Sequence, residues 1–303
     1  MKINHDHMTR IPKFKLSDVI PGASDKVHPA FIVNGKEVDA IYISQYENVI
    51  IDGHAYSLPY QQPATNITFE QAQKACERKG KGWHLMTNAE WAAIALWCKA
   101  NGKIPHGNTN HGRYYHDMSE QGLCYDGYCT LTGSGPDTWS HDHTPEGIFD
   151  LVGNVWEFVA GIRVADGHLQ VIKDNDAAAG ADMSANSLAW QDLDYGFRFD
   201  KGDLYLTKSK NITKDWGGCR FKDLKTDVKV PEELIALGLY PVDTDMGDDY
   251  FWIDNEEKER LVYRGGSWLY TSLAGVFSFH ANYPRSSASY YIGFRSAFCE
   301  TDN

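Results

Sequence analysis

Apolar residues recur at helical spacing in two stretches of the chain, residues 68–80 and 87–102. Each stretch opens with a threonine that is followed three residues later by Gln or Glu, the spacing of a capping box, and each ends at a glycine. The apolar faces consist of Phe69, Ala72 and Cys76 in the first stretch and of Trp91, Ile94, Ala95 and Cys98 in the second. We therefore predict two helices with buried apolar faces, and Cys76 and Cys98 as small core side chains.

Short apolar runs rich in β-branched and aromatic residues predict strands on both sides of these helices. The expected strands are Ala30–Val33, Ala40–Ser44, Asn48–Ile51 and Ile292–Phe298, with hairpin turns at Asn34-Gly35 and Asp52-Gly53. A third, short helix is expected over residues 231–237, where a proline stands at the start.

Residues 1–27 lack either pattern. They are polar and interrupted by prolines, with one apolar patch over residues 11–16 and a turn at Pro21-Gly22. We predict an N-terminal arm over residues 1–27 that packs on a second copy of the chain or on a virion partner. The remaining residues, 28–303, are predicted to form one domain.

The composition narrows the class of partner. The chain has 303 residues, 42% of them hydrophobic, and a formal net charge of -12. This charge argues against binding nucleic acid through its phosphates and against an anionic membrane surface. No apolar run is long enough to insert into a membrane, and the first twenty residues contain no signal-peptide core. The acceptor patterns at Asn66 and Asn211 are therefore read as chance matches.

The stretch from Leu269 to Tyr291 differs in amino-acid composition from the rest of the chain. It contains no Lys, Glu, Gln, Asp, Met or Trp and is filled by Tyr, Ser, Phe, Ala and small polar residues. Tyrosine gives broad amphipathic contact and serine gives adaptable hydrogen bonds, as in antibody binding loops. The alternative is a surface loop between two strands, because aromatic residues also suit strands. Every residue present can be reached from an Asn codon, AAC or AAT, by changing only its two adenines.

Fixed motifs separate the residues of this stretch. The chain has R-G-G-S-W at residues 264–268, A-G-V-F at 274–277, R-S at 285–286 and I-G-F-R at 292–295. With the Asn-codon pattern, these motifs resemble the variable region of diversity-generating retroelement target proteins, in which a reverse transcriptase rewrites adenine-templated codons. The resemblance implies that the following residues vary and contact ligand: Leu269, Tyr270, Ser272, Leu273, His280, Asn282, Tyr283, Ser287, Ser289, Tyr290 and Tyr291. Thr271, Ser278 and Phe279 are left open.

A second resemblance covers most of the chain. Residues 83–91, W-H-L-M-T-N-A-E-W, and residues 147–157, G-I-F-D-L-V-G-N-V-W-E, are similar to motifs of the formylglycine-generating enzyme (sulfatase-modifying factor) family. The motifs run from about residue 38 to 298. They imply an α+β, C-type-lectin-like fold, a twisted mixed sheet with two main helices and long loops. Residues 160–250 are expected to be an insertion, residues 264–298 the variable region, and Glu157 a structural residue.

The same resemblance bears on catalysis. Enzymes of this family use a pair of copper-binding cysteines between the R-G-G-S and G-F-R motifs. Here residues 268–292 contain no cysteine, and Cys299 lies outside the motifs. Thiolates are the ligands that Cu(I) prefers, so we predict that the chain is not an enzyme and needs no cofactor.

Two groups of residues could hold a metal. Asp243, Asp245, Asp248 and Asp249 offer oxygen ligands for Ca²⁺, although a solvated acidic turn is the favoured explanation. Cys124, Cys129, His116, His141 and His143 could form a zinc site, or the two cysteines could pair within a loop. The spacing matches no established metal motif.

These observations predict a ligand-binding protein with a diversified C-terminal surface. We expect its ligand to be a protein or glycan on a target cell, and its location to be a phage tail or a cell surface. The alternatives are a variable binding protein displayed by a bacterium and a non-catalytic relative with a structural role in a virion. Variable side chains are expected to contribute little to stability.

Overall fold

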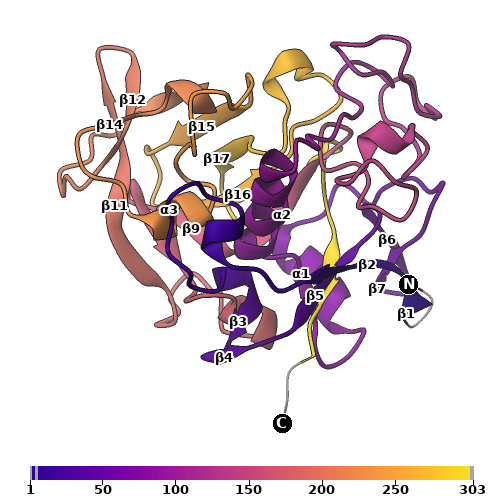
Figure 1. Cartoon of the computed structure of the whole chain (residues 1–303), viewed down its shortest axis with the longest axis horizontal. Helices are drawn as coiled ribbons and strands as arrows, with labels where there is room; N and C mark the ends of the chain where they lie inside the picture. The colour runs from indigo at the N-terminus through magenta and orange to yellow at the C-terminus, as the bar shows by residue number, and fades with distance from the viewer. Residues whose placement is uncertain (1, 4–5, 301–303) are drawn as a thin grey trace.

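The computed structural model describes residues 2–3 and 6–300, which fold into two β-sheets with helices packed against them (Figure 1). The larger sheet follows the order β13-β15-β17-β16-β9-β10-β11-β12-β14, with β18 paired to β9. Its strands are β9 (Trp156–Ala165), β10 (His168–Val171), β11 (Gln191–Asp200), β12 (Asp203–Thr207), β13 (Trp216–Arg220), β14 (Lys225–Thr226), β15 (Tyr250–Asp254), β16 (Glu259–Arg264), β17 (Phe279–Tyr283) and β18 (Ile292–Phe294). This sheet curls until β12, near one end, contacts β13 at the other.

The smaller sheet joins the two ends of the chain. Its order is β1 (Lys2–Ile3), β2 (Asp6–Pro12), β5 (Ala40–Ser44), β19 (Ser296–Phe298) and β8 (Trp83–Leu85). The predicted strand 292–298 is therefore two strands, β18 and β19, which belong to different sheets and meet at Arg295. Two hairpins complete the β-structure: β3 (Ile32–Val33) with β4 (Lys36–Glu37), and β6 (Asn48–Ile51) with β7 (His54–Ser57).

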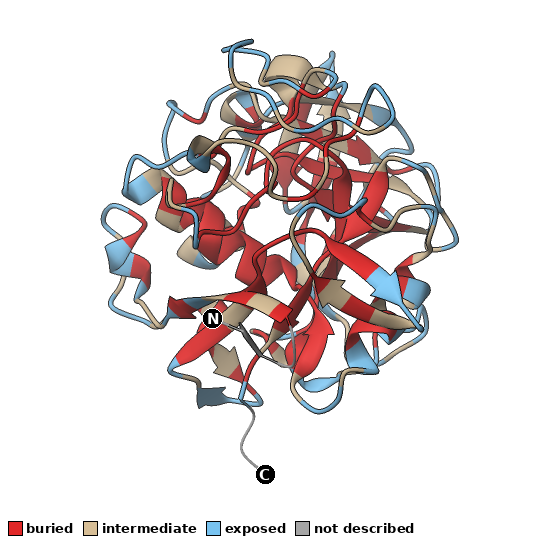
Figure 2. Ribbon diagram, turned by 90° about the vertical axis from the view of Figure 1, so that its right-hand side faces the viewer, coloured by how far each residue is buried: buried red, intermediate tan, exposed pale blue. Residues whose placement is uncertain are grey.

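The two predicted helices are present with their predicted caps. Helix α1 spans Phe69–Glu77 and α2 spans Asn88–Ala100, and Thr68 and Thr87 form capping boxes with Gln71 and Glu90. Helix α3 spans Glu232–Ala236 and follows Pro231. Helix α2 crosses the centre of the molecule and is buried over most of its surface (Figure 2). Short 3-10 turns lie at η1 (Leu16–Asp18), η2 (Pro29–Phe31), η3 (Asp137–Trp139), η4 (Asp176–Ala179), η5 (Phe221–Asp223) and η6 (Thr271–Leu273).

The expected strand Ala30–Val33 is corrected by the structure. Pro29 starts the 3-10 turn η2, which takes up Ala30 and Phe31, so only Ile32 and Val33 are extended. Both turns were predicted correctly: Asn34-Gly35 and Asp52-Gly53 have positive φ at both positions, as two-residue hairpin loops require.

The expected N-terminal arm is also corrected. Strand β2 pairs with β5 along its length, and Met8, Ile11 and Leu16 are buried. Asp6 is buried and forms an ion pair with Lys79 at 3.0 Å. The polar composition of this segment hid its alternation, because every second position of a strand can face the core. Residues 6–27 are thus part of the domain body.

Residues 160–250 contribute more than loops around the domain. Strands β10 to β14 extend the larger sheet, and Leu169, Phe197, Leu206 and Phe221 are buried in the main core. Through β13 this region also reaches β15, the neighbour of β17. The predicted insertion therefore supplies the edge strand β13, which is separated from β17 of the variable region by β15.

Candidate ligand-binding surface

The segment from Arg264 to Ile292 leaves the larger sheet and returns to it. After β16 it forms the turn η6, runs back through the sheet as β17 between β16 and β15, and loops over residues 284–291 to β18. The turn η6 lies at the top of Figure 1, where the chain is coloured near yellow. Strand β17 does not show the alternating burial expected for a strand: Phe279, His280 and Ala281 are all buried, and the last two residues are half-buried. A register shift also separates Leu261 from Tyr263 in the neighbouring strand.

Arg264 anchors the start of the segment. Its guanidinium is buried and donates from Nε and Nη2 to Oδ1 of Asn88, at 3.0 and 2.7 Å, and from Nη2 to the Leu237 carbonyl at 3.2 Å. Its Cζ lies 4.7 Å from the centroid of Phe279. Burial without a carboxylate partner lowers the pKa of Arg264 to about 9, still above neutral pH.

Asp249 anchors the A-G-V-F motif in the middle. Its Oδ2 accepts a hydrogen bond from Phe277 N at 2.7 Å. Gly275 is required here, because a Cβ at this position would lie 2.0 Å from Asp249 Oδ1. Burial raises the pKa of the Asp249 carboxyl to about 6.

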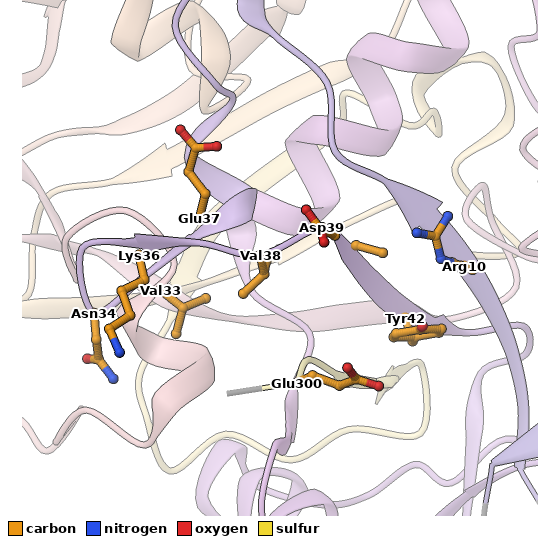
Figure 3. A pocket seen from close by; sticks show the side chains of 10 residues that line it. Arg10, Val33, Asn34, Lys36, Glu37, Val38, Asp39, Tyr42 and Glu300 are labelled. Atoms are coloured by element: carbon orange, nitrogen blue, oxygen red, sulfur yellow. The ribbon is translucent and has the colours of Figure 1, made fainter. Parts of the chain in front are cut away.

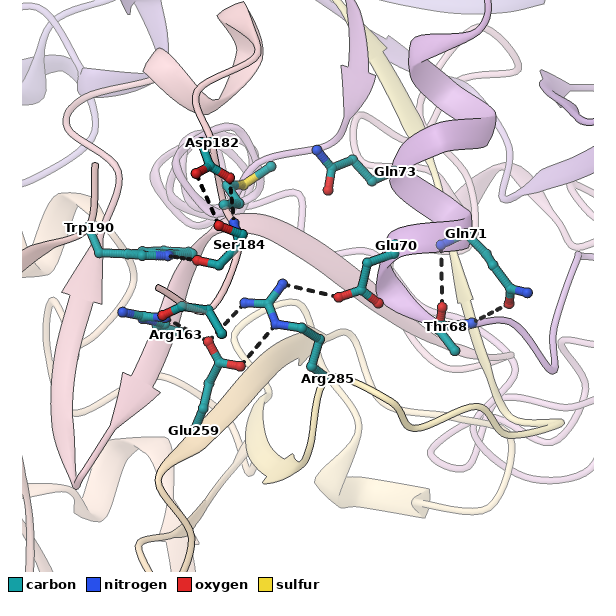
Figure 4. A network of polar contacts seen from close by, with 12 residues as sticks. Thr68, Glu70, Gln71, Gln73, Arg163, Asp182, Ser184, Trp190, Glu259 and Arg285 are labelled. Carbon is teal, nitrogen blue, oxygen red and sulfur yellow. Dashed lines mark hydrogen bonds and ion pairs between the residues drawn. The ribbon is translucent and has the colours of Figure 1, made fainter. Parts of the chain in front are cut away.

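Arg285 anchors the loop 284–291 (Figure 4). Its Nη2 and Nε donate to the two oxygens of Glu259, at 2.8 and 2.9 Å, and its Nη1 lies 3.3 Å from Glu70 on α1. Glu259 is shared with Arg163, whose guanidinium stacks on Trp190 with its Cζ 4.4 Å from the ring centroid. Bidentate pairing of this kind fixes the direction of the arginine as well as its position.

Arg295 anchors the end of the segment. It donates to both oxygens of Glu157, at 2.7 and 2.5 Å, and to the backbone carbonyls of Ser44 and Phe149. Glu47 and Asp150 are also buried nearby, and burial raises the pKa of both carboxyls. Glu157 therefore has the structural role expected from the sequence, as the partner of a buried arginine that ties the two sheets together.

The residues predicted to vary occupy different environments from these anchors. All of them except His280 are exposed or half-buried, and Leu269 and Tyr290 are the most exposed of the set, at 44% and 57%. The A-G-V-F motif between them is buried. Of the three positions left open, Ser278 and Phe279 are buried and belong with the anchors, whereas Thr271 is half-buried.

Three of the predicted contact tyrosines also interact with other side chains of the domain. Tyr270 meets Trp156 edge-on, with ring centroids 5.0 Å apart. The hydroxyl groups of Tyr283 and Tyr291 share a hydrogen bond at 2.5 Å, and burial together with this bond raises the pKa of Tyr283. These side chains therefore support the surface as well as displaying it, so we expect their replacement to cost more stability than replacement of the most exposed variable residues.

His280 does not lie on the surface. It is 3% exposed, and its ring centroid is 4.1 Å from that of Trp156 and 5.4 Å from that of Tyr270. Burial lowers the pKa of His280 to about 3, so the ring is neutral at physiological pH. The expectation of a surface contact is wrong for this residue, because the tyrosines beside it cover the strand on which it lies.

Aromatic residues outside the segment adjoin it, and the sequence did not single them out. Trp268 is flanked by Tyr128 and His111, with ring centroids at 4.7 and 4.8 Å. On the other side, Trp252 of β15 pairs in register with His280. The sequence around such a residue does not indicate that it lies beside the variable segment, because strand pairing between distant parts of the chain determines its neighbours.

The proposed metal sites are not assembled. Among the described residues, no three His, Cys, Asp or Glu side chains come together in a way that could hold a metal ion. The four aspartates of the acidic turn have separate partners: Asp243 and Asp245 pair with Lys99, Asp248 with Lys222, and Asp249 with Phe277 N. His141 is buried, its Nδ1 accepts a hydrogen bond from Ile148 N, and the Cys98 thiol donates to its backbone carbonyl.

The cysteines are free thiols. Cys76 and Cys98 are buried in the core, as predicted. Cys124 is exposed and Cys129 is buried beside Trp268, and no disulfide joins them. Burial raises the pKa of Cys129, Cys219 and Cys299 to about 12, which disfavours thiolate chemistry at neutral pH.

A pocket of about 430 Å³ lies elsewhere in the molecule, beside the β3–β4 hairpin at the bottom of Figure 1. Figure 3 shows that side chains of both charges line it, among them Arg10, Lys36, Glu37 and Glu300. It contains none of the predicted contact residues. The described residues also include no helix with the length and apolar character that a bilayer crossing demands.

The chain is similar to one family of proteins and to several solved structures. A family model described as "Sulfatase-modifying factor enzyme 1-like domain" matches residues 30–298, and no curated protein matches significantly. Among solved structures, the chain is similar to PvdO from Pseudomonas aeruginosa, with 15% identity, a TM-score of 0.42, and 97% of this chain and 94% of that chain covered. It is also similar to Treponema denticola variable protein 1, with 14% identity, a TM-score of 0.39, and coverage of 97% and 95%.

A third similar structure is the Major Tropism Determinant I1 variant, with 11% identity, a TM-score of 0.35, and 95% of this chain but 62% of that chain covered. The family match carries more weight, since it spans nearly the whole described chain. The α+β architecture, with a curled mixed sheet, few helices and long loops, is that of the C-type-lectin-like fold expected from the motifs. The chain belongs to the sulfatase-modifying factor enzyme 1-like domain family.

Proposed function

We propose that this chain is a ligand-binding protein whose surface around residues 269–291 is diversified by a retroelement. The observation that carries the proposal is the division of that segment by environment. The fixed motifs hold buried or ion-paired anchors, while all the predicted variable positions except His280 are exposed or half-buried. A rigid scaffold with replaceable side chains allows new ligands without a new fold.

A non-catalytic role is part of the proposal. The stretch that carries the copper-binding cysteines in the enzymes of this family has none here. Cys299, the thiol that follows this stretch, is buried, and the pKa of its thiol is raised to about 12. Both facts favour binding over thiol-dependent catalysis.

The setting we propose is a phage receptor-binding or tail-associated protein that recognises a protein or glycan on the host surface. Exposed tyrosines suit such a contact, because they bury a large apolar area and keep a polar end. The alternatives are display by a bacterium, and a structural part of a virion in which this surface is covered.

Population sequencing of the source organism or phage tests the diversification. We expect substitutions only at adenine-templated codons between residues 269 and 291, with residues 264–268 and 292–295 constant. A uniform segment, without an adenine-rich template copy nearby, would contradict the proposal.

A double variant, Leu269→Ser with Tyr290→Ala, separates binding from assembly. Both side chains are exposed, so we expect a folded protein and, in the phage setting, intact particles that no longer adsorb to the host. A loss of particles would instead support the structural alternative. Lys36→Ala, in the charged pocket away from the segment, is the matched control and should leave adsorption unchanged.

A further inference from the structure

We infer that the binding surface extends beyond the variable segment along a row of aromatic side chains, and that the exposed end of this row, Trp216 and Trp252, binds the ring face of a neutral glycan. We call Trp216, Trp252, His280 and Trp156 the aromatic ladder. The inference rests on the proposed function, because it names the class of ligand that the same surface takes.

The aromatic ladder crosses the larger sheet from its edge to its centre. Trp216 lies on β13, Trp252 on β15, His280 on β17 and Trp156 on β9. Successive ring centroids are 5.7, 6.1 and 4.1 Å apart, and each ring is tilted by 30° to 34° from the next. Sheet register produces this order, since Trp252 pairs with His280 and its other neighbour, Gly218, lies two residues after Trp216.

Exposure rises steadily from one end of the aromatic ladder to the other. Trp156 and His280 are buried, Trp252 is half-buried, and Trp216 is 57% exposed. Tyr270, one of the predicted variable residues, contacts both of the buried rings. The variable side chains therefore lie beside the inner half, and the outer half continues the same face into solvent.

The outer half is built as a broad platform. Tyr250 lies next to Trp252, with ring centroids 5.9 Å apart. Gly218 makes room for the Tyr250 ring against β13, because a Cβ on Gly218 would lie 2.7 Å from Tyr250 Cε1. Three large rings thus stand together at the edge of the sheet, where a strand of a soluble domain ordinarily presents polar side chains.

The surroundings of the rings favour a sugar over a protein as their ligand. Hot spots for proteins lie in the centre of an interface, inside a rim that excludes water. Here Trp216 follows the exposed residues Thr213, Lys214 and Asp215, and Asp254 stands opposite it on β15. Carboxylate and hydroxyl groups bond sugar hydroxyls, while the axial C–H groups of a pyranose ring are attracted to the negative face of an indole.

Charge selects a neutral sugar. The chain carries a formal charge of -12, although at the outer rings Asp254 is paired with Arg260 and Asp215 lies beside the exposed Lys214. The two arginines closest in sequence to these strands already form ion pairs, Arg220 with Asp248 at 3.2 Å and Arg260 with Asp254 at 2.5 Å. The negative net charge of the chain disfavours a sulfated, phosphorylated or carboxylated glycan, and it disfavours a nucleic acid because of its phosphates.

The test is titration of the purified full chain with neutral hexasaccharides of glucose, N-acetylglucosamine and mannose. Binding is measured by tryptophan fluorescence and by calorimetry. We expect at least one of them to bind with a change in tryptophan emission. Trp216→Ala and Trp252→Ala should each weaken that binding by about tenfold or more, since removal of one stacking ring is of this order. A sulfated hexasaccharide should bind more weakly than its neutral counterpart.

Trp97→Ala is the matched control, because Trp97 is a half-buried indole on α2 that stacks with His141 and takes no part in the aromatic ladder. It should leave binding unchanged. Thermal melting checks that Trp216→Ala is folded, as expected for an exposed side chain. Absence of binding by all three hexasaccharides, or binding that survives both ladder variants, would overturn the inference. Neither result bears on the sequencing test of the variable segment, so the two proposals fail separately.

Discussion

Arg295 and Tyr290 stand close in the chain but differ in what happens to the protein when they are replaced. The polar atoms of Arg295 are all directed at buried partners in two sheets, whereas the Tyr290 side chain is 57% exposed. Replacing one member of a buried ion pair leaves the other charge desolvated without compensation. Replacing an exposed ring removes little packing, so it costs little stability. The same short segment can therefore hold a rigid frame and a surface that tolerates change.

The largest effect is expected at the frame. Arg295→Met removes the partner of Glu157 and leaves Glu157, Glu47 and Asp150 buried without a cation. We expect the free energy of unfolding, measured with urea, to fall by about 3–5 kcal/mol. The double variant Arg295→Met with Glu157→Gln should recover part of this loss. A change under about 1 kcal/mol would show that the frame does not depend on this ion pair.

Trp268→Ala should be the next most costly change. Its indole is 6% exposed and packs among Tyr128, His111, Val155 and Cys129. Loss of this packing should lower the free energy of unfolding by about 3 kcal/mol, as for other large core truncations. Leu123→Ala, an exposed residue of the neighbouring loop, is the control, and an equal effect from both variants would contradict the assignment of Trp268 to the frame.

A smaller, pH-dependent effect is expected at His280. Burial lowers its pKa to about 3, whereas the unfolded chain has a histidine pKa of about 6.5. The unfolded state therefore takes up a proton that the folded state does not, and stability is lost as pH falls below about 6.5. Between pH 7 and pH 5, the wild type should lose on the order of 1–2 kcal/mol more than His280→Phe. Parallel pH profiles for the two proteins would argue against a buried, neutral ring.

The smallest effect is expected at the most exposed variable positions. Tyr290→Ala and Leu269→Ser should each change the free energy of unfolding by less than about 0.5 kcal/mol. Tyr270→Ala should cost more than either, because the Tyr270 ring packs on Trp156. Thermal melting of the three variants side by side measures this difference, and an equal loss at all three would remove the distinction between displayed and supporting tyrosines.

Local signals predicted the parts of this molecule that local chemistry determines. Thr68 and Thr87 marked the starts of both main helices, and Asn34-Gly35 and Asp52-Gly53 marked turns, because caps and turns depend on a few adjacent residues. The division of residues 264–298 into fixed and variable positions is also a prediction from the sequence, and burial departs from it at His280, which is buried, and at Ser286, which is exposed.

Features that depend on distant pairing were missed. Strand β2 was interpreted as an arm because its polar side chains concealed the alternation that pairing with β5 requires. His280 was interpreted as a surface contact because nothing adjacent to it indicates that Tyr270 and Trp252 lie beside it. The aromatic ladder draws on strands from across the sheet, and its members become neighbours only once the register is set.

The position of β19 has a consequence for synthesis of the protein. This strand comes after the variable segment in the chain, yet it lies between β5 and β8 in the middle of the smaller sheet. A product that stops before residue 295 would lack both this strand and Arg295, leaving two strand edges open to degradation or aggregation. Codons that keep the third base of AAC or AAT cannot become stop codons. Diversification of the proposed kind would therefore yield only chains long enough to close the fold.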